Sequence, residues 1–238
     1  MSARPISQLA ALSVVLLTLL ALGACERVKV TIKSHTYDIF PHDSGHYRIS
    51  LVIDTTYNTQ GPVPDTYYKK ELLTGEETDL TGRTARLIEV YRSDEKFGTD
   101  YNFVLSRIWQ QYLAPEDGRD YYAERIEENV RYVLLKFPVS VGVSWNGNLY
   151  NNLGTQAYTY ETDDTTVTVQ GITYENCVLV VQKADTNSFI YDRFAYEIYA
   201  PGIGLIKKYD RNIVNNGPNG EFNASESYFY QEELLEHN

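Results

Sequence analysis

The amino-acid sequence predicts an all-β fold that is mainly antiparallel: a curved sheet, a half-barrel or a sandwich of roughly a dozen strands with little helix. Val, Ile, Thr and Tyr recur in short runs that are separated by Gly, Asn and Asp, which is typical of strands joined by turns. Tyrosine is unusually frequent at 21 residues, whereas methionine occurs once. These features favour pleated, half-buried surfaces over helices.

The strands are predicted from their two-residue period, in which polar and apolar residues alternate. The first, residues 27–33, alternates polar residues with Val28, Val30 and Ile32. The others are predicted at 47–56, 67–73, 84–91, 103–112, 121–127, 130–137, 156–160, 165–169, 177–183, 190–199, 205–209 and 225–232.

Turn residues between these runs predict chain reversals at 73–76, 161–164 and 201–204. The last of these, Pro201–Gly204, joins a proline that fixes φ to glycines that can adopt positive φ. Residues 122–135 could form a helix instead, because Ile126 and Val130 lie four apart. The β-branched and aromatic residues after Asn129 favour strand there.

The first 24 residues have a different composition from the rest of the chain. Arg4 carries the only charge, and residues 9–24 are almost wholly apolar. This is the layout of a secretory signal peptide. The apolar stretch of about sixteen residues is shorter than the roughly 20 that a transmembrane helix needs. A cleaved signal peptide therefore fits this segment better than an uncleaved transmembrane helix.

The end of this segment, Leu22-Gly23-Ala24-Cys25, resembles the lipobox of bacterial lipoproteins. The resemblance implies a thioether between Cys25 and diacylglycerol, cleavage before Cys25, and acylation of the freed amine. Two or three acyl chains would hold the protein on a membrane, since each buried methylene contributes ~0.8 kcal/mol. We expect residues 1–24 to be a signal peptide and residues 25–238 one β-rich extracytoplasmic domain in the bacterial cell envelope, on the outer membrane.

The charge balance excludes some classes of partner. The chain carries a net charge of −11, which becomes −12 when the signal peptide and Arg4 are removed. Nucleic-acid binding depends on neutralising phosphates with Lys and Arg, so no nucleic-acid partner is expected. Anionic lipid is disfavoured for the same reason. Cys177 is left without a disulfide partner if Cys25 is lipidated, and its apolar neighbours predict a buried small hydrophobe.

A candidate binding site surrounds Trp145. An aromatic ring beside Asn146, Asn148 and Tyr150 is a combination that sugar recognition uses, through stacking and amide hydrogen bonds. The alternative is a tryptophan that closes one end of the core, next to a hairpin turn at Asn146-Gly147. The second interpretation is favoured.

Three histidines, His35, His42 and His46, lie close together and have aspartates among them. Such ligands could hold zinc or copper. Pro41 and Gly45 disfavour a helical arrangement of these side chains, so a polar loop is favoured over a metal site. No metal and no cofactor are therefore predicted, and a metal-handling lipoprotein is kept as an alternative.

No catalytic motif stands out. The sequence has no Gly-x-Ser-x-Gly elbow, no Walker loop and no dinucleotide-binding fingerprint. Nothing singles out a catalytic pair among its 32 acidic residues. We therefore expect no enzymatic activity, and keep as an alternative a glycan-directed hydrolase that uses paired carboxylates near Trp145.

Two segments carry a family resemblance: Phe137-Pro138-Val139 with Gly142-Val143-Ser144-Trp145-Asn146-Gly147-Asn148, and Glu197-Ile198-Tyr199-Ala200-Pro201-Gly202-Ile203-Gly204-Leu205-Ile206-Lys207-Lys208. Together they resemble envelope lipoproteins common in Bacteroidetes and, more loosely, TapB-like lipoprotein domains, over residues 130–210. The resemblance implies an antiparallel β half-barrel and brings no catalytic residues.

The sequence thus predicts a lipid-anchored binding or scaffold module whose partner is another envelope protein, a glycan or an apolar ligand. A large hydrophobic concavity would favour lipid-like cargo, and a filled core with flat edges would favour protein partners.

Overall fold

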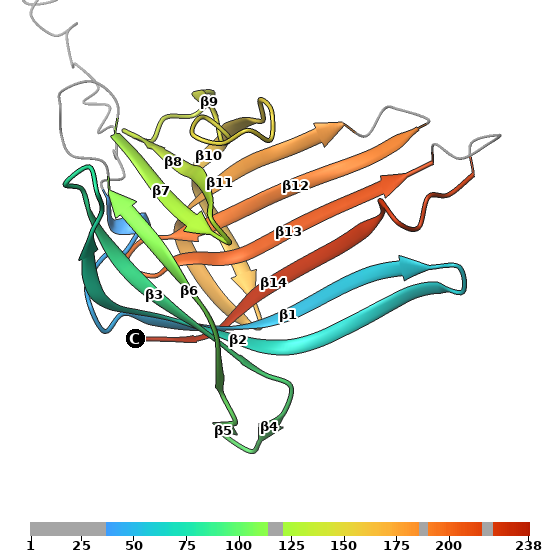
Figure 1. The fold of residues 1–238 in the computed structure, drawn as a ribbon, viewed down its shortest axis with the longest axis horizontal. Helices are drawn as coiled ribbons and strands as arrows, with labels where there is room; N and C mark the ends of the chain where they lie inside the picture. The colour runs from blue at the N-terminus through green and yellow to red at the C-terminus, as the bar shows by residue number, and fades with distance from the viewer. Residues whose placement is uncertain (1–36, 114–120, 186–189, 216–220) are drawn as a thin grey trace, which may run out of the picture. The chain divides into compact units, whose positions relative to one another are not determined.

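A computed structural model gives the structure of the protein and describes residues 37–113, 121–185, 190–215 and 221–238 (Figure 1). They belong to one compact unit, Ser34–Asn238. The chain enters through a short 3-10 helix, η1 (Tyr37–Ile39), and no α-helix occurs in these ranges. None of the described segments is a long apolar helix that could span a bilayer. The strand predicted at 27–33 lies outside the described residues.

The all-β prediction is confirmed, because the domain is built on one antiparallel sheet of 12 strands. The strands lie in the order β8-β7-β6-β3-β2-β1-β14-β13-β12-β11-β10-β9. A small separate hairpin is formed by β4 (Lys96–Phe97) and β5 (Asp100–Tyr101). The strands of the main sheet are β1 (Tyr47–Asn58), β2 (Gly61–Thr78), β3 (Thr84–Ser93), β6 (Val104–Leu113), β7 (Tyr121–Glu127), β8 (Val130–Phe137), β9 (Ser144–Asn146), β10 (Ala157–Val169), β11 (Ile172–Asp185), β12 (Tyr191–Ala200), β13 (Gly204–Val214) and β14 (Tyr228–His237).

The sheet curls until its two edge strands, β8 and β9, meet at one end. The Val133 amide donates to the Gly147 carbonyl at 2.8 Å, and Trp145 Nε1 donates to the Val133 carbonyl at 3.1 Å. The Tyr160 hydroxyl donates to the Lys136 carbonyl at 2.7 Å. A single curved sheet therefore replaces the sandwich that the sequence left open. The long strands β12, β13, β14, β1 and β2 run well past the closed end (Figure 1).

The hydrophobic core fills this closed end. Its buried residues are Ile39, Phe40, Ala123, Val133, Leu134, Leu135, Phe137, Val139, Trp145, Tyr158, Tyr160, Val178, Val180, Tyr199 and Leu205. A second cluster, which contains Val169, Tyr174 and Cys177 from β10 and β11, packs against Ile198 and other residues of the sheet. Cys177 is fully buried there, as its apolar neighbours predict, and burial raises the pKa of its thiol to about 11.

Two hairpins turn on consecutive residues with positive φ. Glu128 and Asn129 have φ of 48° and 65°, and Gln170 and Gly171 have φ of 50° and 81°. Two positive φ angles in a two-residue loop match the twist of the flanking strands. The helical alternative for residues 122–135 is therefore wrong, since this segment is β7, a tight turn and β8.

Two of the predicted turns are wrong, because the residues lie inside strands. Residues 73–76 lie inside β2, where the pairing with β3 shifts between Leu73 and Glu76. Gly75 lies at this irregularity, and a glycine inside a strand often marks a β-bulge. Gly75 itself does not adopt positive φ. Residues 161–164 lie inside β10, whose register against β11 shifts repeatedly. Lacking glycine or proline, this polar run bends the strand and does not reverse it. The predicted turn at Pro201–Gly204 is confirmed.

Gly147 allows the aromatic packing at the closed end. A Cβ placed on Gly147 would overlap the ring of Tyr158. We expect Gly147→Ala to lower the free energy of unfolding by about 1–3 kcal/mol, because the ring must shift within a packed core. Gly75→Ala is the matched control, since a Cβ added there would meet open space, and a change within about 0.5 kcal/mol is expected. Urea unfolding of both variants tests this, and equal losses would contradict it.

Candidate functional site

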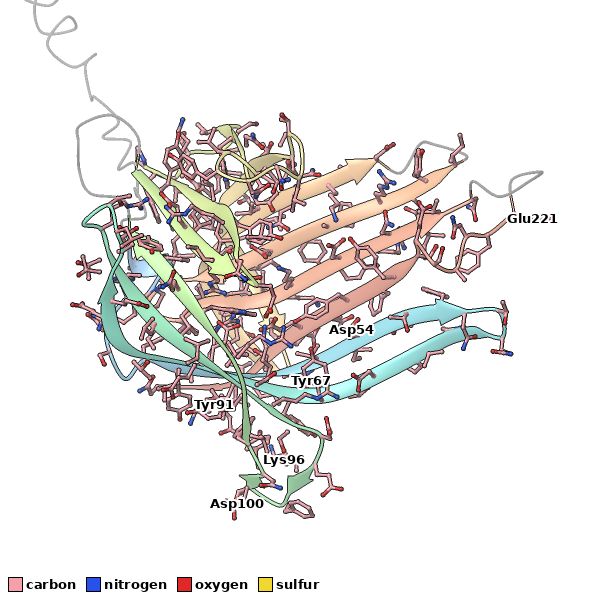
Figure 2. The ribbon with its side chains drawn as sticks, in the orientation of Figure 1. Asp54, Tyr67, Tyr91, Lys96, Asp100 and Glu221 are labelled. Carbon is pink, nitrogen blue, oxygen red and sulfur yellow. The ribbon has the colours of Figure 1, made fainter. Side chains whose placement is uncertain are left out.

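The inner face of the curved sheet carries a cavity of about 740 Å³ that is partly open to solvent. This volume lies within the roughly 300–1,000 Å³ of small-molecule pockets. Side chains from both halves of the sheet line it, and Figure 2 marks Asp54 on β1 and Tyr67 on β2 among them. The lining is mostly charged, amide and tyrosine side chains, so it is not the hydrophobic concavity that lipid-like cargo would require.

Strand alternation explains why so many polar groups point inward. Register places Glu197, Lys208 and Glu232 directly opposite one another on β12, β13 and β14. The same row continues through Val52 on β1 to Tyr67 on β2. Residues that lie opposite one another share a face of the sheet. One row across five strands thus brings two carboxylates and an ammonium group onto the inner face.

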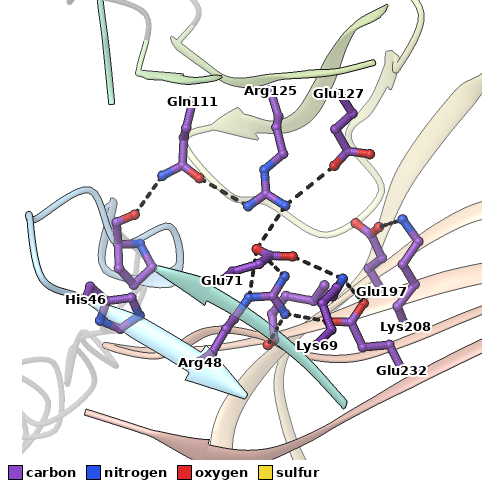
Figure 3. Close-up of polar contacts among 12 residues, drawn as sticks. His46, Arg48, Lys69, Glu71, Gln111, Arg125, Glu127, Glu197, Lys208 and Glu232 are labelled. Atoms are coloured by element: carbon purple, nitrogen blue, oxygen red, sulfur yellow. Dashed lines mark hydrogen bonds and ion pairs between the residues drawn. The ribbon is translucent and has the colours of Figure 1, made fainter. Parts of the chain in front are cut away.

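Five buried charged residues form an inner network, defined as Arg48, Lys69, Glu71, Arg125 and Glu232 (Figure 3). Arg48 contacts Glu71 at 2.7 Å and Glu232 at 3.0 Å. Lys69 lies 3.0 Å from Glu71 and also pairs with Glu232. Arg125 reaches Glu71 at 3.4 Å from the opposite wall. The side chains of Glu71 and Glu232 are only 2% exposed, so these ion pairs are shielded from water.

Electrostatics keep the buried carboxylates ionised. Burial alone would raise the pKa of Glu71, but Arg48, Lys69 and Arg125 outweigh burial and hold it well below the usual range. The same balance lowers the pKa of Glu232 to about 2, with Lys69 as the strongest opposing charge. A charged residue without a partner would be very costly at such a position, so the network is held together by mutual compensation.

A second ion pair lies beside the inner network. Lys208 Nζ is 2.8 Å from Glu197, whose other oxygen accepts a hydrogen bond from the Tyr199 hydroxyl at 2.5 Å. Burial would raise the pKa of Glu197, but Lys208 reverses the effect and lowers it. Glu127 extends the cluster toward β7 through a 3.6 Å contact with Arg125. Figure 3 shows this pair next to the inner network.

Aromatic rings share the cavity wall with the charges. Lys69 and Arg125 each lie 5.7 Å from the ring centroid of Trp109, which is consistent with cation–π attraction. The hydroxyl groups of Tyr67, Tyr132 and Tyr158 line the cavity without a hydrogen bond to any described residue. These hydroxyls can therefore donate to or accept from a ligand without breaking a contact.

The four binding residues predicted around Trp145 do not form one site: they differ in burial and in whether they line the cavity. Trp145 is 7% exposed and packs edge-on against Tyr158, which agrees with the interpretation that it closes the core. The Asn146 side chain accepts hydrogen bonds from two backbone amides, and Asn148 donates to the Gly154 carbonyl. Tyr150 is 48% exposed. Asn148 alone of the four lines the cavity, and a ligand-binding role for the four stays a prediction.

The two histidines of the predicted cluster that the structure describes, His42 and His46, contact different partners. His46 Nε2 lies 3.1 Å from the Ile203 carbonyl, and His42 Nδ1 lies 3.4 Å from Gln111 Nε2. Burial lowers the pKa of both rings. His35 and Cys25 lie outside the described residues. Within the described ranges, no group of three or more His, Cys, Asp or Glu side chains could hold a metal ion.

Sequence reasoning did not identify the charged lining. Arg48, Lys69, Glu71 and Glu232 lie in strands that were predicted, but no role was predicted for these four side chains. One signal was present: Tyr67, Lys69 and Glu71 alternate on β2 with residues that are also polar or aromatic. A strand with polar residues on both faces indicates that one of those faces lines a polar interior.

Comparisons with known proteins do not assign this chain to a family. No protein family matches the chain, and neither does any curated protein. Among solved structures, the chain is similar to a "putative lipoprotein" from Parabacteroides distasonis, with 10% sequence identity and a TM-score of 0.31 over 84% of this chain and 98% of that one. So low a TM-score supports neither a shared fold nor a shared function.

Proposed function

We propose that this protein is a lipid-anchored binding protein of the bacterial envelope, which holds a polar ligand in the cavity of its half-barrel. The observation that carries the proposal is the 740 Å³ cavity, whose wall combines paired charges with tyrosine hydroxyls. Ligand sites use a few fixed polar groups to orient a bound molecule, and rigid strands hold such groups more firmly than loops do.

The character of the cavity argues against the other candidates. An apolar ligand would displace water from the charged side chains of the cavity wall and offer them no hydrogen bonds in return, which is unfavourable. Hydrolysis by paired carboxylates needs one of them protonated, which requires a raised pKa. Glu71, Glu197 and Glu232 all have lowered pKa values, so none of these three suits that role. Asp54 is a lining carboxylate whose pKa is raised, by burial and by the charge of Asp65. Binding is the proposal that the three paired glutamates fit.

The membrane anchor rests on the sequence alone. The apolar segment that ends in Leu22-Gly23-Ala24-Cys25 supports lipidation of Cys25 and an extracytoplasmic location, and the outer membrane is the proposed site. A scaffold that only joins proteins would not need a hollow inner face. The lipid supplies position at a surface, and the cavity supplies recognition.

The binding proposal is tested by narrowing the cavity mouth. Leu153 lines the cavity and is 59% exposed, whereas Leu149, in the same loop, is 46% exposed and lies outside the lining. Isothermal titration calorimetry with a panel of neutral and charged oligosaccharides should identify at least one ligand. Leu153→Trp should weaken that ligand about tenfold, which is about 1.4 kcal/mol, and Leu149→Trp should not. Absence of any binding, or equal effects of both variants, would contradict the proposal.

The anchor is tested separately. We expect Cys25→Ser to abolish lipidation and leave an unprocessed precursor, because serine offers no thiol for the thioether. Intact-mass measurement of the membrane fraction checks this: the native protein should carry the mass of residues 25–238 plus acyl chains. A Cys25→Ser protein that is cleaved normally and retained on the membrane would refute lipid anchoring.

A further inference from the structure

We infer that the ligand of the inner cavity is an uncharged, hydroxyl-rich molecule, namely a neutral oligosaccharide. This inference rests on the proposed function and names its ligand class. It is carried by the pairing of the charges on the cavity wall and by the tyrosine hydroxyls that are left free beside them.

Every Lys and Arg side chain that lines the cavity is already paired with a carboxylate. Within the described residues the pairs are Arg48 with Glu71 and Glu232, Lys69 with Glu71 and Glu232, Arg125 with Glu71 and Glu127, Lys208 with Glu197, Lys183 with Asp210, Arg92 with Asp65 and Asp94, and Arg107 with Glu128. Among these lining residues, no cation is therefore left over to neutralise an anionic ligand.

A charged ligand would have to disrupt this pairing. An anion that recruited Lys69 or Arg48 would leave Glu71 or Glu232 buried without its partner, which is strongly unfavourable. A cation would face the same difficulty with the arginines and lysines. An uncharged ligand avoids both costs, because hydroxyl groups can bond to paired ions without separating them.

One lining carboxylate, Asp54, has no ion pair among the described contacts. It lies directly opposite Asp65 on the neighbouring strand, and Asp65 is held by Arg92 at 2.9 Å. Burial and the Asp65 charge both raise the pKa of Asp54, which reduces its charge as the pH falls. Asp54 therefore gives little reason for a strongly cationic ligand.

The free hydroxyls supply the contacts that a sugar needs. Tyr132 and Tyr158 lie on β8 and β10 and line the same cavity as the Glu197–Lys208 pair. The charge of Lys208 acts on both phenols, whereas the carboxylate that acts most strongly on Tyr158 is Glu197 and the one that acts on Tyr132 is Glu127. Glu197 offers acceptor oxygens, Lys208 offers donors, and each phenol can do either. Sugar hydroxyls also donate and accept, and the faces of sugar rings pack on aromatic rings.

The test compares matched saccharides on the mature domain. Neutral tetrasaccharides of α- or β-linked glucose, galactose, mannose and N-acetylglucosamine are titrated by calorimetry. Each is paired with a charged counterpart of the same linkage, oxidised to the uronate at C6 or deacetylated to the amine. We expect at least one neutral member to bind, its charged counterpart to bind about tenfold more weakly or not at all, and its Kd to change less than about twofold between low and high salt.

A conservative variant locates the contact. Tyr158→Phe removes only the free hydroxyl and should weaken the neutral ligand about five- to tenfold, within the range expected for a lost hydrogen bond. Tyr196→Phe is the matched control, since Tyr196 stacks on Tyr209 and does not line the cavity, and it should bind as the native protein does.

The outcomes separate the two proposals. Tighter binding of a uronate or an amine, with steep salt dependence, would overturn the neutral-ligand inference and leave the proposed cavity function intact. Binding of a neutral saccharide that Leu153→Trp or Tyr158→Phe does not weaken would place it elsewhere and overturn the inference. If no saccharide of either kind binds, both proposals fail.

Discussion

Replacing Glu71 with glutamine is expected to lower the free energy of unfolding by about 3–5 kcal/mol, the largest loss that one substitution on the inner face should cause. Glu71 is 2% exposed and contacts Arg48, Lys69 and Arg125. Glutamine preserves the shape of the side chain but leaves three buried cations with only Glu232 and Glu127 as partners. Urea unfolding of the mature domain, followed by tyrosine and tryptophan fluorescence, measures the loss.

The control for this prediction is Asp65→Asn on the same strand. Asp65 pairs with Arg92 at 2.9 Å, but its side chain is 52% exposed, so its pair is screened by water and should contribute no more than about 1 kcal/mol. If both variants lose similar stability, burial is not what makes the inner network strong.

Much of the fold could be predicted from the sequence, because strand alternation and tight-turn residues are local signals. The strands β1, β3, β6, β7, β8 and β12 lie where alternation indicated them. The strands β11 and β13 extend beyond their predicted ranges, and β14 (Tyr228–His237) is shifted toward the carboxyl end from the predicted 225–232. The errors at 73–76 and 161–164 arose because glycine and runs of acidic residues mark bulges as well as turns. The short strand β9 was missed, since three residues are too few to show a period.

The candidate site could not be predicted in the same way. Arg48 meets Glu232 across 184 residues of sequence, and the two face each other only because β14 returns to pair with β1. The register of that pairing includes a shift between Ile49 and Ser50. Nothing local to Arg48 specifies either the partner strand or the shift. The sequence analysis therefore predicted no role for Arg48.

For Trp145, in contrast, the favoured interpretation from sequence, a ring that closes the core, agrees with its burial in the structure. The Asn146-Gly147 pair beside it predicted a hairpin turn, and this prediction is wrong: β9 ends at Asn146, β10 begins only at Ala157, and Gly147 does not adopt positive φ. The glycine is needed instead because the ring of Tyr158 lies against it. The core position of Trp145 therefore follows from its packing against Tyr158 and not from the predicted turn. The cavity lies on the same face of the sheet, but its lining comes from strands far apart in the sequence.

Acid should unfold this protein more steeply than its exposed charges alone would allow. The pKa values of Glu71, Glu197 and Glu232 are all lowered by neighbouring cations, despite burial that acts the other way. A group with a lowered folded-state pKa stabilises the fold fully above its unfolded-state pKa and loses that contribution as the pH falls toward its folded-state value. For Glu232 this window runs from 4.5 down to about 2. Each unit of pKa difference contributes about 1.4 kcal/mol.

The cations of the network do not offset this loss. The pKa values of Lys69 and Lys208 are raised by their carboxylate partners, which outweigh burial, so their contribution is complete at neutral and acid pH and declines only above the usual lysine range. Glu232→Gln should therefore be less stable than the native protein at neutral pH, yet lose less further stability between pH 4.5 and about 2. Glu77→Gln, an exposed change on β2, should follow the native curve. Urea midpoints across this pH range decide the matter, and parallel curves for the native protein and Glu232→Gln would show that the buried carboxylate is not the group whose protonation drives acid unfolding.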